Sequence, residues 1–424
     1  MTSALVVSRF APSAERAHGP QLRLRTLVEA LARVVDRVDC LVLVPLNQSC
    51  GPDVIHAHEK RLRRLWSNPI TLRFAPTVDL ALPKSRWQRF AAGVFDFRAQ
   101  TIARPTSTPA TVAAVSAALD ARPDIVLVQR LDSMVPLLRV ARETPEKIRR
   151  IPIFFDMDDI EHVAFRRHLL HNPPGRLQRL LLLQLPALML AEMRAMRLAV
   201  GTFVCSDSDR HYLAGLARGA QVHTVPNSVA FPTLNDTGTS EPLVMFVGSL
   251  YYPPNAQAAK SLVREIWPIV RAQVPAARLA IIGPGPDPAL RPEVDESVIF
   301  PGFVDDLEPW YRRARVVCCP IYHGAGTRLK IVEAAAYAKA VVSTPLGAEG
   351  LDFEDEREIV LRDSPAEIAE ACVRLLSDAA AAARLGGAAL QKARRRYERG
   401  AVVQRLAGVF RAGRADSVSE SLSA

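Results

Sequence analysis

The sequence predicts an α/β protein built from two doubly wound, Rossmann-like domains. The chain has 424 residues, which is more than one hydrophobic core usually serves, so two domains of roughly 200 residues each are expected. Short apolar runs alternate with helix-like segments along the chain, as in parallel sheets covered by helices. Residues 230–241, AFPTLNDTGTSE, are polar, turn-rich and without periodicity, which is typical of a linker between two such domains.

The first domain is expected over residues 1–230. It begins with a strand in ALVVSRF, continues with an amphipathic helix in QLRLRTLVEALARVV and returns to a strand in VDCLVLVPL. Four further apolar runs follow, each with polar residues at its carboxyl end: PDIVLVQR, IPIFFDMDD, GTFVCSDSD and AQVHTVPNSV. Ligands of open α/β sheets bind at those strand ends, so we expect functional residues there.

The second domain is expected over residues 241–395. Strand signals recur in PLVMFVGS, ARLAIIGPG, SVIFPGF, RVVCCPI and AVVSTP. Helices are expected from about Asn255 to Gln273, in DLEPWYRRA and directly after the loop HGAGTR. Residues 396–424 then predict a basic helix that ends in a disordered tail.

The amino-acid composition limits the classes of binding partner that we expect. The chain has 54 Lys and Arg residues and 44 Asp and Glu residues, so its formal net charge is 54 − 44, or +10. This positive charge favours anionic partners such as nucleotide diphosphates or acidic headgroups. A nucleic-acid binder is disfavoured, because the arginines are scattered and only 6% of residues are aromatic. Cys205, Cys318 and Cys319 lie in strand-like runs without metal-ligand spacing, so we expect buried, reduced thiols.

We expect neither a secretory signal at the start of the sequence nor a membrane-spanning segment. The first residues lack a basic region before their short apolar run, and we expect a cytoplasmic protein. The longest apolar stretch, residues 177–199, is interrupted by Gln184 and Pro186. These interruptions leave far fewer than the roughly 20 apolar residues that a spanning helix needs. We interpret it as a buried core helix, with contact to a membrane surface as the alternative.

The loop-to-helix junction HGAGTRLK predicts an anion site. The amino end of a helix carries unpaired N–H groups and a partial positive charge. Gly324 and Gly326 allow close approach of a phosphate, and Arg328 and Lys330 add formal charge. The alternative is that the glycines only shape a turn and that Lys330 pairs with Glu333 three residues later.

Three further strand-end loops strengthen the prediction of a nucleotide pocket. The loop FVGSLYYPPN contains Gly248 and Ser249, and IIGPGP contains Gly283 and Gly285. A third loop, PGFVDDL, places Val304 after another strand. Each loop alone is more often an ordinary turn between a strand and a helix.

These motifs resemble a known family. Residues 243–351 are similar to the donor-binding domain of group 1, family 4 glycosyltransferases of the GT-B fold, in which two Rossmann-like domains face each other across a cleft. The matched motifs, in order, are VPNSV, the strand ending in FVG, PPN, IIG, FPGFVDD, VVCCPI and GAGTRLKIVEA, followed by VVSTPLGAEGL. The first half matches more loosely. The nearest resemblance is to sugar transferases of bacterial exopolysaccharide clusters.

The resemblance implies a donor-binding role for each matched position. Glu333 corresponds to the second glutamate of the family's paired-glutamate motif and would bind the ribose hydroxyls; the first glutamate is replaced by Ala325. His323 would touch the donor phosphate or cap its strand, and Glu349 would contact the sugar or replace the carboxylate absent at Ala325. The implied donor-binding set is Gly248, Ser249, Gly283, Gly285, Val304, His323, Gly324, Gly326, Thr327, Glu333 and Glu349.

A second departure concerns the diphosphate. Many relatives place an arginine and a lysine in the loop that reads GSLYYPPN here, and neither is present. We therefore assign Arg328 and Lys330 as the catalytic cations. Fixed positive charge lowers the barrier, because negative charge grows on the leaving diphosphate as the anomeric bond breaks. No metal or other cofactor is then required. Retention of the anomeric configuration is implied by the resemblance alone.

The acceptor side gives weaker signals. Gly19, which precedes the first helix, and Arg23 would contact the acceptor, although a plain helix start explains Gly19 as well. FFDMDDIEH places Asp156, Asp158, Asp159, Glu161 and His162 at a strand's carboxyl end, and we assign Asp158 as the base or sugar anchor, with a solvated loop as the alternative. A metal site in DMD and a ligand role for His56 and His58 are disfavoured.

The resulting hypothesis is a glycosyltransferase that uses a nucleotide-diphosphate sugar and a glycan or lipid-linked acceptor. By resemblance, the C-terminal helix would cross back onto the first domain. The net charge suits peripheral contact with an anionic membrane. The alternatives are a nucleotide-sugar 2-epimerase of the same fold and a non-catalytic nucleotide-sugar-binding subunit.

Overall fold

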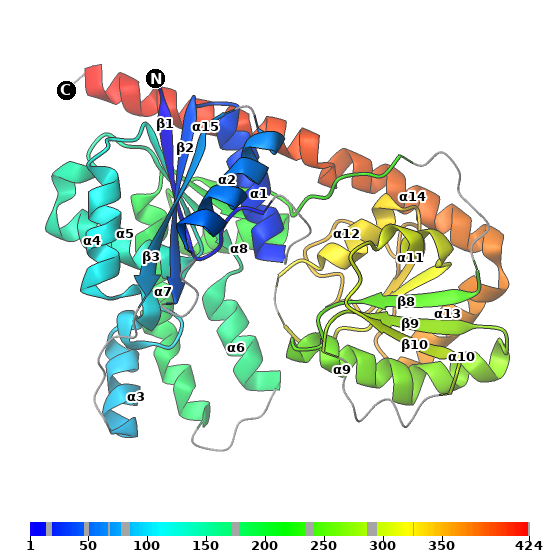
Figure 1. Ribbon diagram of the computed structural model, residues 1–424. Coiled ribbons are helices and arrows are strands. Elements are labelled where there is room, and N and C mark those ends of the chain that lie inside the picture. Colours follow the sequence, from blue (N-terminus) through cyan, green and yellow to red (C-terminus); the bar gives the residue numbers. More distant parts are fainter. Residues whose placement is uncertain are drawn as a thin grey trace. The chain divides into compact units, whose positions relative to one another are not determined.

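The computed structural model describes residues 1–13, 19–45, 51–66, 68–77, 85–171, 178–233, 241–285, 295–324 and 326–422. The chain divides into two compact units. We call Met1–Pro226 together with Val402–Ala424 the N-terminal unit, and Asn227–Ala401 the C-terminal unit. Each unit holds one parallel sheet with helices packed on it, which confirms the predicted α/β, Rossmann-like class (Figure 1).

The N-terminal unit is built on a seven-stranded parallel sheet in the order β3-β2-β1-β4-β5-β6-β7. The chain leaves the central strand β1 toward one side and later continues from β4 on the other side, so the order reverses between β1 and β4. The strands are β1 (Ser3–Ser8), β2 (Arg37–Pro45), β3 (Ile70–Thr77), β4 (Ile125–Gln129), β5 (Ile153–Asp158), β6 (Gly201–Val204) and β7 (Val222–Thr224).

Both faces of this sheet are buried. Ala4 and Val6 of β1 pack into one core cluster, whereas Leu5 and Val7 pack into another, because successive side chains of a strand point to opposite faces. The first cluster contains residues of α1 (Gly19–Ala32), α2 (Pro52–Leu65) and α15 (Arg399–Leu422). The second contains residues of α4 (Pro109–Leu119), α5 (Leu131–Glu143) and α7 (Leu185–Leu198).

Shorter elements complete the unit. They are α3 (Arg86–Phe95), α6 (Glu161–His171), α8 (Asp207–Leu216) and the 3-10 segments η2 (Phe97–Ala99), η3 (Arg104–Thr106), η4 (Pro145–Lys147) and η5 (Gln178–Gln184). The α15 helix packs Phe410 edge-on against Phe154, with ring centroids 4.8 Å apart. It continues to Leu422, so the segment expected as a disordered tail is helical as far as the structure describes it.

The C-terminal unit repeats the plan with a six-stranded parallel sheet in the order β10-β9-β8-β11-β12-β13. Here the order reverses between β8 and β11. The strands are β8 (Leu243–Val247), β9 (Arg278–Ile282), β10 (Val298–Gly302), β11 (Val316–Cys319), β12 (Ala340–Ser343) and β13 (Val360–Leu361).

The three helices predicted for residues 255–273, DLEPWYRRA and the segment after HGAGTR are all present, and α13 (Pro365–Ser377) was not predicted. The helix expected over residues 255–273 forms as α9 (Pro253–Ser261), the π-turn η6 (Leu262–Ile266) and α10 (Trp267–Gln273) in succession. The remaining helices are α11 (Glu308–Arg313), α12 (Leu329–Ala336), α13 (Pro365–Ser377) and α14 (Ala379–Tyr397). A capping box between Ser364 and Glu367 begins α13.

Two sequence interpretations need correction, and one falls partly outside the structure. The edge strand β3 was not anticipated, because Arg73 and Pro76 interrupt its apolar pattern. The stretch 177–199 is not one buried core helix: it forms η5 and α7, with Leu183 54% exposed and Leu190 43% exposed. In the linker predicted at 230–241, residues 234–240 lie outside the described residues.

The structure confirms the cysteine prediction and locates His56 and His58 of the first domain. Cys205, Cys318 and Cys319 are buried free thiols. His56 is exposed on α2 and His58 bonds the carbonyl of Pro12 at 2.8 Å. The described residues contain no group of three or more metal-ligating side chains.

Candidate functional site

The reversal of strand order between β8 and β11 locates the candidate site of the C-terminal unit. Ligands of doubly wound sheets bind outside the carboxyl ends of the strands at such a point. The loop after β8 contains Gly248 and Ser249, and the loop after β11 contains His323 and Gly324 and leads into α12. The topology therefore brings the two most informative sequence motifs of this half together.

Close backbone packing joins the three glycine loops. The Gly248 N–H donates to the Ile282 carbonyl at 2.9 Å, and the Gly283 N–H donates to the Gly302 carbonyl at 2.9 Å. A Cβ atom at Gly283, whose φ is +149°, would lie 2.0 Å from the Gly248 carbonyl oxygen. Glycine is required at this position because both the φ angle and the contact exclude a side chain. Gly285, Ser249 and Val304 lie on the same set of loops.

Lys330 reaches from the first turn of α12 to the loop after β8. Its ammonium donates to the Asn255 side-chain oxygen at 2.8 Å and lies 4.3 Å from the centroid of the Phe246 ring. A Cβ atom at Gly248 would lie 2.8 Å from the same ammonium, so glycine keeps this space open. Burial lowers the pKa of Lys330 to about 8, and the nearby Arg328 lowers it as well. The ammonium therefore lacks full charge compensation, and an anion would raise that pKa again.

Asn255 is a site residue that sequence reasoning did not select. Its amide nitrogen donates to the Ser249 carbonyl at 3.0 Å while its oxygen accepts from Lys330. The amide thus holds the loop after β8 and aims the lysine at it. The signal was present in the PPN motif, but an asparagine after two prolines also reads as an ordinary helix start.

Arg328 lies at the beginning of α12, next to the backbone of the glycine loop. Its guanidinium donates to the Gly326 carbonyl, and no acidic residue occupies the first turn of the helix. A Cβ atom at Gly324 would lie 3.1 Å from the Arg328 guanidinium and 3.3 Å from the Tyr252 hydroxyl. The helix dipole, Arg328 and Lys330 thus contribute positive charge to one place.

The remaining predicted donor residues surround this junction. The Thr327 hydroxyl accepts from the Asn227 amide at 2.9 Å, which ties the VPNSV segment to the glycine loop. Glu333 accepts from the Tyr311 hydroxyl at 3.2 Å. His323 is buried and Glu349 is partly buried. Ala325 lies outside the described residues, so the question of the absent first glutamate stays a sequence argument.

The N-terminal unit places its predicted residues in a different electrostatic setting. Arg23 is 3% exposed, and its guanidinium pairs with Asp156 at 2.8 and 3.0 Å through Nε and donates to the Val225 carbonyl at 2.7 Å. The charge of Arg23 is therefore buried and matched by a carboxylate, and its contact with an acceptor stays a prediction. Gly19, the other predicted acceptor residue, is exposed at the start of α1.

Asp158 ends β5 in a left-handed conformation with φ +59°. Such a conformation is costly for a residue other than glycine and is frequent at functional sites. The carboxylate accepts from Arg130 at 3.3 Å. Burial raises the pKa of Asp158, although Arg23 and Arg130 oppose the change.

Arg130 is a central residue of this cluster that sequence reasoning did not select. It follows β4 with φ +67° and donates to Glu161 at 2.8 Å as well as to Asp158. Burial raises the pKa of Glu161 to about 7, against the effect of Arg130. Arg130 is the last residue of the predicted strand segment PDIVLVQR, but an arginine at a strand end is also common on protein surfaces.

His162 belongs to a separate chain of hydrogen bonds. Its Nδ1 bonds the buried carboxylate of Glu192, and its Nε2 bonds the Tyr212 hydroxyl at 2.7 Å. Tyr212 is 44% exposed. The chain of residues links α6, α7 and α8, which no local sequence pattern predicts. His162 lies in α6, which follows β5, and Tyr212 lies in α8, which follows β6.

Comparison with known families finds one match, in the C-terminal half. Residues 241–378 match the model of the family described as Glycosyl transferases group 1. An uncharacterized 44.6 kDa protein of the cps region of Klebsiella pneumoniae is 27% identical over 128 residues, which cover 28% of this chain and 33% of that protein. The match therefore spans about a third of this curated relative's length.

Solved structures cover almost the whole chain. A sucrose-phosphate synthase from Thermosynechococcus elongatus is 18% identical, with a TM-score of 0.68 over 97% of this chain and 98% of that chain. Anabaena HepE with bound UDP and glucose is 14% identical, with a TM-score of 0.65 over 97% and 100%. TarM is 10% identical, with a TM-score of 0.68 over 97% and 99%. These likenesses establish the fold that the motifs predicted, GT-B.

Among the helices that the structure describes, none is both long enough and apolar enough to cross a membrane.

Proposed function

We propose that this protein, whose residues 241–378 form a group 1 glycosyltransferase domain within a GT-B fold, transfers a sugar from a nucleotide-diphosphate sugar to a glycan or lipid-linked acceptor. The observation that carries the proposal is the junction of Lys330, Asn255 and Gly248 at the point where the strand order reverses. It combines two cations and a helix amino end with space kept open by glycine, which suits a diphosphate.

The proposed chemistry uses the cations directly. As the bond between the anomeric carbon and the diphosphate oxygen breaks, negative charge grows on the leaving group, and Lys330 and Arg328 stabilise it. Loss of one such preorganised contact costs about 3 kcal/mol, or roughly a hundredfold in rate. With this charge supplied by side chains, we propose a metal-independent reaction. Retention of configuration and membership of family 4 are part of the proposal and rest on the motif resemblance.

The donor base is proposed by comparison. Two neighbours of the same fold are described as complexes with UDP or UDP-glucose, the Anabaena protein HepE and S. aureus TarM. UDP-sugars are therefore the first donors to test. The cps-region relative supports a role in polysaccharide biosynthesis, and a cytoplasmic location would give access to nucleotide sugars.

The proposal is tested by thermal shift with a panel of nucleotide sugars on the wild type, on Arg328→Ala and on Arg278→Ala. Arg278 is the matched control, since it is exposed at the amino end of β9. We expect a UDP-sugar to raise the midpoint of the wild type and the control, and to have little effect on Arg328→Ala. No shift with any donor, or an equal shift in all three proteins, would refute the diphosphate assignment.

Product analysis then separates the two alternatives. An epimerase converts the donor sugar without any acceptor, whereas a transferase releases the nucleoside diphosphate and labels an acceptor from extracted lipids or glycans. Donor binding without conversion or transfer would favour the non-catalytic subunit. We expect transfer.

As a second part of the proposal, the protein contacts a membrane surface. The observation behind it is a group of exposed apolar side chains on α3 and η5. Trp87 and Phe95 of α3 are 62% and 87% exposed, and Leu183 of the adjoining η5 is 54% exposed. The side chain of Gln184 donates to the Phe90 carbonyl and links the two elements. Exposed aromatic and aliphatic side chains beside the exposed Arg89 and Arg179 suit an anionic membrane surface.

Trp87 also provides the test. Of the four tryptophans, Trp66 and Trp267 are buried and Trp310 is partly buried against the core of the other unit. A blue shift of fluorescence on adding phosphatidylglycerol vesicles therefore reports mainly on Trp87. We expect the shift to be lost in Phe95→Ser and kept in Tyr251→Ser, where Tyr251 is an exposed aromatic of the other unit. An unchanged wild-type spectrum would argue against this contact.

A further inference from the structure

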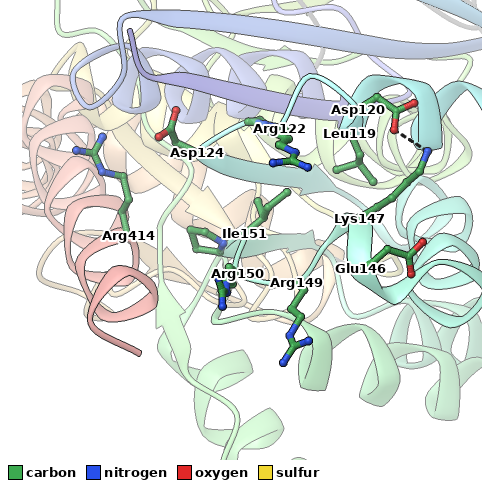
Figure 2. A pocket seen from close by; sticks show the side chains of 12 residues that line it. Leu119, Asp120, Arg122, Asp124, Glu146, Lys147, Arg149, Arg150, Ile151 and Arg414 are labelled. Carbon is green, nitrogen blue, oxygen red and sulfur yellow. Dashed lines mark ion pairs between the residues drawn. The ribbon is translucent and has the colours of Figure 1, made fainter. Parts of the chain in front are cut away.

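A hollow of about 760 Å³ lies in the N-terminal unit at the amino ends of β4 and β5, away from the strand ends that carry Arg130 and Asp158. We call it the basic hollow. Figure 2 shows arginine side chains around it and Lys147 turned toward Asp120. Its lining residues are Leu119, Asp120, Arg122, Pro123, Asp124, Glu146, Lys147, Arg149, Arg150, Ile151, Pro152 and Arg414.

The sheet topology explains why these residues meet. β4 and β5 are neighbours, with Val126 opposite Ile153, so the segments that enter the two strands are also neighbours. Arg122 lies in the segment that enters β4, and Arg149 and Arg150 lie in the segment that enters β5. The three arginines therefore gather at one edge although the helix α5 separates them in the sequence.

Two of these arginines occupy backbone positions that favour glycine. Arg122 has φ +50° at the end of α4, and Arg150 has φ +74° in the turn before β5. A left-handed conformation costs a residue with a side chain roughly 1 kcal/mol or more relative to glycine. Helices commonly end with glycine in this conformation. Arginine at both positions indicates that the side chains contribute something that offsets the strain.

The charges in the hollow are unevenly matched. The ammonium of Lys147 pairs with Asp120 at 2.7 Å, and the Asp124 carboxylate accepts the Ser3 N–H at 2.7 Å. The exposed side chains of Arg122, Arg149 and Arg150 have no hydrogen bond or ion pair with any residue that the structure describes. With five basic and three acidic residues in the lining, the hollow has a formal charge of 5 − 3, or +2.

We propose that the basic hollow is a binding site for a phosphate group, held by Arg122 and Arg150 with Arg149 at its rim. A phosphate presents several acceptor oxygens to planar guanidinium groups, which bind it through paired hydrogen bonds. Glu146 and Asp124 in the lining would repel large polyanions and favour a single compact headgroup. The site is independent of the proposed sugar-donor site, which lies in the other unit.

The left-handed backbone at Arg122 and Arg150 allows glycine substitutions that remove the charge without straining the fold. Arg122→Gly and Arg150→Gly each remove a guanidinium and also relieve the left-handed backbone, so the double variant should fold at least as stably as the wild type. The charge-matched control is Arg142→Ala with Arg218→Ala, two exposed arginines of the same unit outside the hollow. All proteins carry Lys330→Met to suppress phosphate binding at the donor site.

Binding is measured by calorimetry at constant ionic strength with two probes, inorganic phosphate and dihexanoyl phosphatidic acid below its micelle concentration. We expect saturable one-site binding in the control, and affinity at least about tenfold lower in the double glycine variant, the effect of losing charge-assisted hydrogen bonds. If both probes bind, the site accepts either a free phosphate or a lipid headgroup. If only the lipid binds, the ligand is a lipid headgroup.

The proposal is overturned if neither probe binds the control, or if the glycine variant binds as tightly as the control. A thermal midpoint of the glycine variant equal to or above that of the control shows that any loss of binding does not come from unfolding. Failure of the sugar-donor experiments would leave this result unaffected, because Lys330→Met is common to all the proteins compared and the substitutions that differ between them lie in the N-terminal unit.

Discussion

The strand-end loops of the two units show opposite ways of placing cations on the same doubly wound architecture. In the C-terminal unit, Lys330 bonds a neutral amide and its pKa is lowered to about 8 by burial. In the N-terminal unit, Arg23 and Arg130 pair with Asp156, Asp158 and Glu161. The first arrangement has charge available for an anion. In the second arrangement the arginines are paired within the unit, and burial raises the pKa of Asp158 and Glu161.

The largest expected effect concerns the internal pairing of the N-terminal unit. Arg23→Leu leaves Asp156 as an uncompensated buried charge, and we expect the free energy of unfolding to fall by about 3–5 kcal/mol. Urea unfolding measures the change. The double variant Arg23→Leu, Asp156→Leu should recover much of it, because both charges are then removed. Equal loss in the single and double variants would mean that packing, and not the ion pair, explains the effect.

The next effect concerns the available charge of the C-terminal unit. We expect Lys330→Met to weaken binding of the nucleotide sugar by roughly tenfold to a hundredfold, the range for a lost charge-assisted hydrogen bond. Lys339→Met is the matched control, since burial also lowers the pKa of Lys339 to about 8 while its ammonium donates to the Arg312 carbonyl. Similar weakening in both variants would remove the special role of Lys330.

A smaller effect is the pH dependence of donor binding. The Lys330 ammonium binds an anion only when it is protonated, and its pKa without ligand is about 8. Affinity should therefore be steady below that value and decline as pH rises through it, by at most about tenfold per pH unit. Calorimetry in buffers of different ionisation heat would also show proton uptake on binding. Lys330→Arg should abolish the decline, and a persistent decline would assign it to another group.

The smallest expected effect is the pH dependence of the free energy of unfolding that comes from Glu161 of the N-terminal unit. Burial raises the pKa of Glu161 to about 7, above its value in the unfolded chain, so the folded state binds the extra proton. Stability from this group is present at low pH and is lost as pH rises toward 7, by about 1 kcal/mol per pH unit. Glu161→Gln should flatten that slope in urea unfolding. An unchanged slope would show that Glu161 is ionised throughout the range.

The glycine and cation motifs of the C-terminal half were predictable because each can be recognised from a few consecutive residues. Gly248 and Gly283 follow apolar strands, and Arg328 and Lys330 begin a helix, so a phosphate site follows from short segments of sequence. Asn255 was missed because its role depends on a lysine 75 positions away. Whether Arg328 and Lys330 act on a donor stays a prediction until binding is measured.

The N-terminal half was harder to interpret for a physical reason. Arg23 begins an amphipathic helix and looked available to a ligand, yet it is buried against Asp156, 133 positions farther along the chain. Arg130 and Asp158 also act through partners on neighbouring strands. Long-range ion pairs of this kind leave no local periodicity, and only the sheet order brings their members together.

By itself, the sequence determined the two alternating α/β units and the glycine-lined, basic loop of the second, because these features depend on periodicity and on residue type over short distances. The tertiary structure alone decided which charges are matched and which are available. It buried Arg23, aimed Lys330 at the loop after β8, and gathered Arg122 and Arg150 around the basic hollow. The effective charge of an arginine or lysine depends on burial and on partners distant in the chain, which emerge only when the strands take their order in the sheet.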